Sequence, residues 1–475
     1  MSNSQTESSL PTLAHTLDQF EDCMDLSHRE FPNLGVHAVY LNTLISGAKL
    51  QNEVFKPLHD LEPDQLTTLF QQSQFEKQTD DKALILGILS GKAAVFAEEQ
   101  VYLIDVRGAE GRAITNSEIE TTITGPHDAL TEQVSLSLML IRARIRSTHL
   151  KIVKLSVGEI TKNDVYILYI KDIANMDNVQ ELKQRISDIE IDAVHDTNML
   201  IQLIDDRPYA LFPQILTTER PDAVVSKLVA GRVVGIMDGS PSAFSVPSTF
   251  YEFFSSSDDY YQRWMLGTAT RMLRFFALIV TVSLTALYVS VTTFHYEMIP
   301  ENLLMTLVES RSRVPFPPLY EALLMEMTIE LLREAGARLP TKIGQTIGIV
   351  GGIVIGQAAV QAGFTSNILI IAVALSTIAS FVIPNYTMSA SIRLMRFGFI
   401  LLAGLWGNLG IAIGITATTI HLCSLISMKA SYVTPIAPNQ PYEWRDVFIR
   451  APFNLLKKRP TQSRPMNMTR VKPKR

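Results

Sequence analysis

Three glutamates at four-residue spacing are the side chains of this sequence with the clearest capacity for chemistry. Glu326, Glu330 and Glu334 lie in a segment with helical hydrophobic periodicity, residues 314–340. Four residues turn an α-helix by about 40° more than a full circle, so the three carboxylates form one acidic stripe. Rings of carboxylates from several subunits attract cations to a conduction path. The stripe is therefore a candidate ion path.

The same segment also fits a different arrangement. An amphipathic helix lying flat at a membrane interface would expose these acids, and Glu330 would then pair with Arg333. Both interpretations stay open at the level of sequence.

Glycine recurs at every fourth position in the following segment, at Gly344, Gly348, Gly352 and Gly356. On one helix these positions place four missing side chains along nearly one face, where another backbone can approach closely. The pattern predicts a helix-packing seam. Its partner is either another helix of the same subunit or a helix that lines an assembly or pore.

No catalytic centre is indicated. The sequence has no phosphate-binding Gly-x-x-x-x-Gly-Lys motif, no His-Glu-x-x-His motif and no Cys/His cluster of metal-ligand spacing. Its two cysteines, Cys23 and Cys423, are far apart in the chain. We therefore expect no enzyme activity, no catalytic residue, no metal and no cofactor, and we assign no ligand-binding residue.

Long uncharged runs surround the candidate residues and predict membrane-spanning helices. Residues 275–294 carry no charge, which matches one bilayer crossing at 1.5 Å per residue. Residues 343–392 contain no Asp, Glu, Lys or Arg and are long enough for two spans. Residues 397–428 form a further run broken by glycines, either one long tilted helix or two short ones.

These runs predict an all-α bundle of four to six membrane helices over residues 263–440. The count depends on whether residues 314–340 cross the membrane. Arg263, Arg271 and Arg274 precede the first span, so the positive-inside rule places its start in the cytoplasm. An even number of crossings then puts both ends of the chain in the cytoplasm.

The more polar first half predicts a mixed α+β region, because short strand-like runs alternate with amphipathic helical stretches. We divide it into a first cytoplasmic α+β unit, residues 36–157, and a second unit with its connector, residues 158–262. Within the first unit, residues 83–108 are expected to form a small meander.

The two ends of the chain are expected to lie outside these units. Residues 1–35 are polar, without sustained periodicity or the features of a secretory signal peptide, and predict a flexible leader. Residues 441–475 predict a basic cytoplasmic tail that is attracted to anionic membrane lipids rather than to nucleic acid.

Several long phrases, in order and at similar separations, carry a family resemblance. They are IMDGSPSAFSVPSTFYEFFSSSDDYYQRW, TTFHYEMIPENLL, VPFPPLYEALLMEMTIELLREAG, RLPTKIGQTIGIVGGIVIGQAAVQAG, ASFVIPNYTMSASIRLMRF and FIRAPF. Over residues 200–460 the chain closely resembles the A subunit of GerA-type spore germinant receptors. GPHDALTEQVSLSLMLIRARI and VYLNTLISGAKLQNEVFKPL are more weakly similar to that family's N-terminal domain. The stage V sporulation protein AF branch is also similar.

The resemblance implies a protein of the spore inner membrane, with its N-terminal domain and C-terminal tail in the cytoplasm. It implies partnership with a multispanning B subunit and a lipoprotein C subunit, which together sense nutrients and start germination. It further implies that the A subunit forms a homo-oligomer and a germinant-gated cation channel, which suits the acidic stripe and the glycine seam.

Two other functions stay open. The chain could be a non-conducting scaffold of the receptor complex. It could also be a secondary transporter of a small solute or ion, although the sequence shows no convincing internal repeat of the kind such transporters have.

Overall fold

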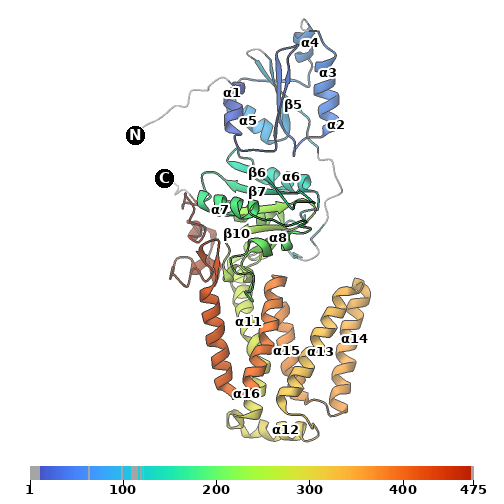
Figure 1. The fold of residues 1–475 in the computed structure, drawn as a ribbon, viewed down its shortest axis with the longest axis vertical. Helices are drawn as coiled ribbons and strands as arrows, with labels where there is room; N and C mark the ends of the chain where they lie inside the picture. The colour runs from blue at the N-terminus through green and yellow to red at the C-terminus, as the bar shows by residue number, and fades with distance from the viewer. Residues whose placement is uncertain are drawn as a thin grey trace.

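Two α/β units stand end to end above a helical region in the elongated chain (Figure 1). The computed structural model describes residues 11–62, 65–97, 100–108, 116, 117, 120 and 122–471, without the side chains of residues 341–350. A mixed α/β N-terminal region followed by a helical C-terminal region is the order that the sequence predicts.

The first unit is a five-stranded antiparallel sheet, in the order β1-β2-β4-β5-β3, with helices on both faces. Residues of β2 alternate between the two faces: Val36 and Ala38 join one core cluster, and Val39 and Leu41 join the other. The strands are β1 (Leu26–Phe31), β2 (Val36–Leu41), β3 (Glu76–Gln78), β4 (Lys92–Ala97) and β5 (Gln100–Asp105). The helices are α1 (Leu13–Gln19), α2 (Gly47–Lys49), the π-helix Leu50–Phe55, α3 (Lys56–His59), α4 (Leu66–Phe70) and α5 (Asp81–Leu89).

Two features of this unit differ from the sequence-based expectation. The apolar run expected as the first strand of a meander is helix α5, because the Asp80 carboxylate caps it by accepting hydrogen bonds from two backbone amides of its first turn. The expected leader, residues 1–35, contains α1 and β1. Its residues 11–35 are ordered because β1 pairs with β2 and because Phe20 and Cys23 are buried in the core.

The second unit is another five-stranded antiparallel sheet, in the order β6-β7-β9-β10-β8, with α6 and α9 on one face and α7 and α8 on the other. Its strands are β6 (Leu150–Val157), β7 (Asn163–Ile170), β8 (Leu216–Thr218), β9 (Val233–Met237) and β10 (Ala243–Val246). Its helices are α6 (Val134–Arg144), α7 (Met176–Ser187), α8 (Thr197–Ile204) and α9 (Pro221–Val229). Strand β6 pairs with β7 along its whole length, so the division between the units lies before α6 and not between residues 157 and 158.

The helical region contains long helices that run along the long axis and one, α12, that lies across the end far from the α/β units (Figure 1). Its elements are the 3-10 helix Phe250–Phe254, α10 (Asp258–Tyr261), α11 (Trp264–Thr293), the 3-10 helix Tyr296–Met298, α12 (Glu301–Arg311), α13 (Pro318–Arg338), α14 (Thr341–Gln361), α15 (Asn367–Phe381) and α16 (Tyr386–Ser424). Within the described part of the chain, α11 and α16 are long and apolar enough to cross a membrane, and α15 is a shorter apolar helix.

Helix α16 reverses direction at Gly407. The φ and ψ angles of this glycine, 58° and −137°, lie in a region that residues with a Cβ avoid. Thr418 in the second arm lies beside Met395 in the first, with 3.5 Å between Oγ1 and Sδ. The uncharged run of residues 397–428 therefore contains a sharp turn between two antiparallel arms, residues 386–406 and 408–424.

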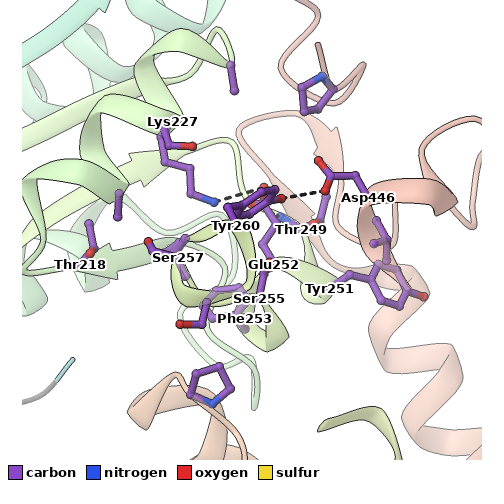
Figure 2. A pocket seen from close by; sticks show the side chains of 18 of the residues that line it. Thr218, Lys227, Thr249, Tyr251, Glu252, Phe253, Ser255, Ser257, Tyr260 and Asp446 are labelled. Atoms are coloured by element: carbon purple, nitrogen blue, oxygen red, sulfur yellow. Dashed lines mark hydrogen bonds and ion pairs between the residues drawn. The ribbon is translucent and has the colours of Figure 1, made fainter. Parts of the chain in front are cut away.

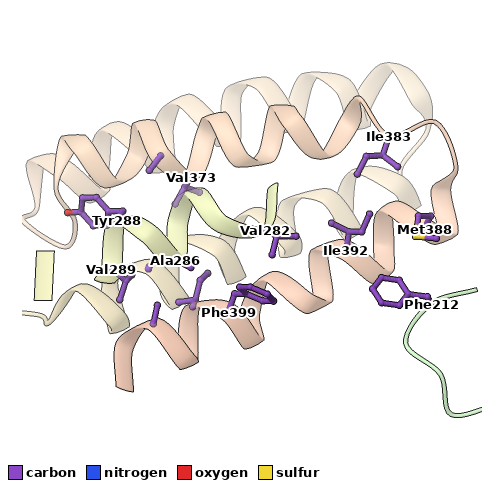
Figure 3. Close-up of a cluster of buried hydrophobic side chains, with 14 of the residues drawn as sticks. Phe212, Val282, Ala286, Tyr288, Val289, Val373, Ile383, Met388, Ile392 and Phe399 are labelled. Carbon is purple, nitrogen blue, oxygen red and sulfur yellow. The ribbon is translucent and has the colours of Figure 1, made fainter. Parts of the chain in front are cut away.

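The core of the helical region is formed by α11, α15 and the first arm of α16. Figure 3 shows Val282 of α11, Val373 of α15 and Phe399 of α16 within one buried cluster. Phe212 of the second α/β unit joins the same cluster near Met388, at the start of α16. The apolar core is thus continuous from the helices into the second unit.

The segment after α16 folds back onto the second α/β unit. Its elements are β11 (Ile426–Ser427), β12 (Ala430–Ser431), α17 (Trp444–Val447) and the 3-10 helix Phe453–Leu455. The Met466 amide donates to the Ile173 carbonyl at 3.0 Å, and the guanidinium of the buried Arg459 donates to the Val229 carbonyl at 2.8 Å. The segment expected as a basic tail attracted to lipids, residues 441–475, is docked on the second α/β unit through residue 471, and Arg459 within it donates to main-chain carbonyls.

A pH-dependent stability follows from Asp205, at the end of α8. Burial, and next the charge of Asp206, raise the pKa of Asp205 from 3.8 to about 7. The folded chain holds this proton more tightly than the unfolded chain, so stability falls as the pH rises from about 4 to 7. We expect Asp205→Asn to melt higher than the wild type at pH 8, by about 2–4 °C, and the difference to shrink toward zero as the pH falls to about 4. Thermal unfolding of the purified chain in detergent tests this. The exposed Asp188 supplies the control Asp188→Asn, and an equal shift at both pH values would contradict the assignment.

Candidate functional site: charged residues between apolar helices

Glu326, the first residue of the acidic stripe, lies where α13 meets α11, α15 and α16. Its Oε2 lies 2.7 Å from Nη2 of Arg396, on the first arm of α16, and both side chains are fully buried. Thr285 of α11 and Ser376 of α15 donate hydrogen bonds to Glu326 Oε1 at 2.8 and 3.3 Å. One buried carboxylate therefore joins four helices.

Glu330 lies one turn further along α13 and interacts with three arginines. Its Oε1 is 3.2 Å from Arg396 Nη2, 3.4 Å from Arg393 Nε and 3.6 Å from Arg333 Nη1. The structure thus contains the Glu330–Arg333 pair that we expected for a helix lying flat at a membrane interface. The pair lies instead in α13, which packs against the other helices of the bundle.

Glu334, the third residue of the stripe, lies outside this network. Its Oε1 is 2.6 Å from Arg338 Nη2, and both side chains are exposed. The stripe is therefore divided, with two carboxylates inside the bundle and one at its surface.

The buried network carries more positive than negative groups. Two carboxylates, Glu326 and Glu330, face the guanidinium groups of Arg333, Arg393 and Arg396. Neither carboxylate is free to bind a cation in this arrangement. Charges among apolar helices are unfavourable unless they are paired, and they commonly mark functional positions in membranes. The arrangement can hold α13 against α16, and it can release α13 if the ion pairs rearrange.

The glycine seam lies on α14, which packs against α13 through Gly351. A Cβ added at Gly352 or Gly356 would meet no atom within 4 Å in the described part of the chain. The surroundings of Gly344 and Gly348 lie outside the described side chains. At Gly352 and Gly356, then, no other helix of the described chain occupies the seam.

A second polar cluster lies at the end of the bundle far from the α/β units. The buried Glu321 accepts a hydrogen bond from the Ser366 amide at 3.2 Å, and its Oε1 is 3.4 Å from Nη2 of Arg311. The hydroxyl groups of Tyr288 and Ser366 are 2.7 Å apart. This cluster ties α11, α12, α13 and the start of α15 together.

Sequence reasoning missed the partners of the stripe. Sequence patterns assign no role to Arg393 and Arg396, yet both contact Glu330 from the first arm of α16. A charge balance could have found them: acids on one apolar helix require bases on another. Among the described residues, no group of three or more His, Cys, Asp or Glu side chains is arranged to hold a metal.

Comparisons with known proteins give a consistent result. A family model described as Bacillus/Clostridium GerA spore germination protein matches residues 14–462. Spore germination protein GerQA of Bacillus cereus is 42% identical over 449 residues, which cover 93% of this chain and 90% of that protein. Spore germination protein KA of Bacillus subtilis (strain 168) is 37% identical and covers 89% of this chain and 79% of its own length.

Two further matches are a membrane protein and a solved structure of an N-terminal domain. A membrane protein of Bacillus subtilis (strain 168), YfkQ, is 35% identical over 95% of this chain and 91% of its own length. The N-terminal domain of the A subunit of the Bacillus megaterium germinant receptor GerK3 aligns over 52% of this chain and 99% of that domain, with 24% identity and a TM-score of 0.40.

Proposed function

Because this chain belongs to the GerA family of spore germination proteins, we propose that it is the A subunit of a nutrient germinant receptor in the spore inner membrane. In this role it helps to start germination when nutrients are sensed. Its partners are membrane lipids, a multispanning B subunit and a lipoprotein C subunit of the same receptor.

The helical region crosses the membrane six times in this proposal. The crossing segments are α11, α13, α14, α15 and the two arms of α16. An even number of crossings agrees with the position of both α/β units and the C-terminal segment at the same end of the helices (Figure 1). Arg263, Arg271 and Arg274 at the start of α11 support a cytoplasmic position for that end.

Several copies of the chain assemble into a cation channel in this proposal. The observation that carries it is the buried charge network of Glu326 and Glu330, because charges placed among lipid-length apolar helices usually serve a pathway or a gate. Since arginines neutralise both carboxylates here, we assign the network to gating. The uncovered face of Gly352 and Gly356 supports α14 as the helix that meets a second copy.

One observation favours a second candidate function. Glu326 and Glu330 both form ion pairs with arginine, which is expected if the network serves only to hold the helices together. The chain would then be a scaffold subunit that conducts nothing itself.

Replacing Glu330 by glutamine separates the two functions. The substitution removes the charge that bridges three arginines, so we expect germinant-triggered potassium release from spores to slow about tenfold, equivalent to about 1.4 kcal/mol of activation free energy. Potassium release is measured after germinant addition, with the abundance of this chain and its partner subunits checked in the same spores.

Glu334→Gln is the matched control, because its partner Arg338 is exposed and outside the network. Normal release from Glu330→Gln spores at normal abundance would favour the scaffold. Slow release at normal abundance supports the gate.

A further inference from the structure

A polar cavity of about 630 Å³ lies where the second α/β unit, the loop between α15 and α16 and the C-terminal segment meet. Small-molecule sites commonly have volumes of about 300–1,000 Å³. In Figure 2, Lys227 of α9 points toward Glu252, and Tyr260 of α10 points toward Asp446 of α17. Side chains from four separate parts of the chain therefore form its wall.

Arg232 places unused hydrogen-bond donors at this cavity. Its side chain lines the cavity and is 1% exposed, and its Nη2 donates to Glu252 and, at 3.0 Å, to Gln462 Oε1. The Nε and Nη1 atoms of Arg232 and the Nε2 atom of Gln462 have no hydrogen-bond partner among the described residues. Buried donors normally have partners, because leaving them unpaired is unfavourable.

The charges around Arg232 favour an anion. One carboxylate, Glu252, serves both Arg232 and Lys227, whose Nζ lies 3.4 Å from Glu252 Oε1. Arg459 also lines the cavity, and its Nε and Nη1 atoms donate to main-chain carbonyls, which do not balance its charge. Burial lowers the pKa of Lys227, and an anion beside it would stabilise the protonated form.

Glu120, Asp258 and Glu443 also line the cavity, and Arg274, Lys458 and Arg470 line it beside them. Two other acidic residues of the wall have basic partners. Asp222 pairs with Arg220 at 2.7 Å, and Asp446 lies 3.4 Å from Arg271 Nη1 while accepting a hydrogen bond from Tyr260. These acids therefore do not neutralise the group around Arg232.

We propose that this cavity binds a small soluble oxyanion, a carboxylate or phosphate compound, through an unpaired N–H donor of Arg232 together with Gln462 and Lys227. The Nε–H and Nη1–H groups of Arg232 point to different sides of the guanidinium, so one of them donates to one oxygen of the anion, and Gln462 Nε2 and Lys227 Nζ serve the other oxygens. The inference rests on the cavity alone and does not depend on the proposed role in germination. A bound anion would tie α9 and β9 of the second unit to the C-terminal segment.

The test uses the full chain in nanodiscs of phosphatidylcholine. Thermal unfolding is followed while inorganic phosphate, pyrophosphate or malonate is added at millimolar concentration. We expect at least one of these probes to stabilise the wild-type chain, and Arg232→Lys to bind that probe about tenfold more weakly, because lysine keeps the charge but loses the fixed N–H donors of the planar guanidinium. Arg185→Lys is the control: Arg185 is an ion-paired arginine of the same unit that does not line the cavity.

Three results would overturn the proposal. The first is no stabilisation of the wild-type chain by any of the three probes. The second is equal weakening in the Arg232 and Arg185 variants, or in neither. The third is stabilisation only when the nanodisc contains phosphatidylglycerol, which would identify a lipid headgroup as the anion. If Arg232→Lys does not fold, Gln462→Leu takes its place, with the same expected direction.

Discussion

Arg396→Met is expected to lower the free energy of unfolding of the helical region by about 3–5 kcal/mol. The substitution leaves the Glu326 carboxylate fully buried without its ion-pair partner, held only by the hydroxyl groups of Thr285 and Ser376. Methionine has a similar length, so the change removes charge more than volume. Thermal unfolding of the purified chain in detergent, followed by circular dichroism, measures the effect.

Two further variants identify the cause of the loss. Arg338→Met removes an arginine of the same region whose pair with Glu334 is exposed, and we expect a change below about 1 kcal/mol. The double variant Glu326→Met with Arg396→Met removes both buried charges and should recover most of the lost stability. If Arg396→Met unfolds with the stability of the wild type, the buried pair does not hold these helices together.

Gly407→Ala is expected to destabilise the turn between the two arms of α16 by about 1–3 kcal/mol. The added Cβ would have to adopt a backbone conformation that only glycine visits readily, and it would lie 3.0 Å from His295 Nε2 and 3.1 Å from Phe294 Cβ. Gly398→Ala is the matched control in the first arm, because a Cβ there meets no atom of the described chain within 4 Å. Alanine at that helical position should be neutral or stabilising by up to about 1 kcal/mol.

Cross-linking shows whether the turn forms. Cysteines introduced by Met395→Cys and Thr418→Cys, with Cys23 and Cys423 replaced, should be joined by a short bifunctional thiol reagent, because the native side chains at these positions are in contact across the two arms. We expect Gly398→Ala to leave the cross-link intact and Gly407→Ala to reduce it. A straight α16 would separate the two positions by about 35 Å, so a complete failure to cross-link would contradict the antiparallel arms.

Local sequence patterns were sufficient for much of the fold. The amphipathic run after residue 133 forms α6, and the strand-like runs at Leu150–Val157 and Asn163–Ile170 pair as β6 and β7. These elements were predictable because their periodicity is short and their partners are neighbours in the chain. Helix α5 was not, since a single capping residue, Asp80, decides between helix and strand for a short apolar run.

Contacts between distant residues were beyond local patterns. The pairing of Glu326 with Arg396 and the reversal at Gly407 depend on how whole helices pack, and the glycines of α16 permit a turn without requiring one. Docking of the C-terminal segment depends on hydrogen bonds from Arg459 to main-chain carbonyls, which leave no periodic signal. The candidate ion path stays a prediction that the Glu330→Gln experiment tests, and the seam at Gly344, Gly348, Gly352 and Gly356 stays a prediction.

The docked C-terminal segment has a consequence for biosynthesis. During synthesis, the second α/β unit leaves the ribosome before the helices, and the C-terminal segment follows last. In that segment Gln462 accepts a hydrogen bond from Arg232, and Ser463 donates one to the Ala230 carbonyl. The second α/β unit therefore reaches its final form only after every helix has been synthesised and the second arm of α16 has brought the chain back to the end of the helices where this unit lies (Figure 1). Completion of the second α/β unit therefore depends on the packing of the helices that precede the C-terminal segment in the chain.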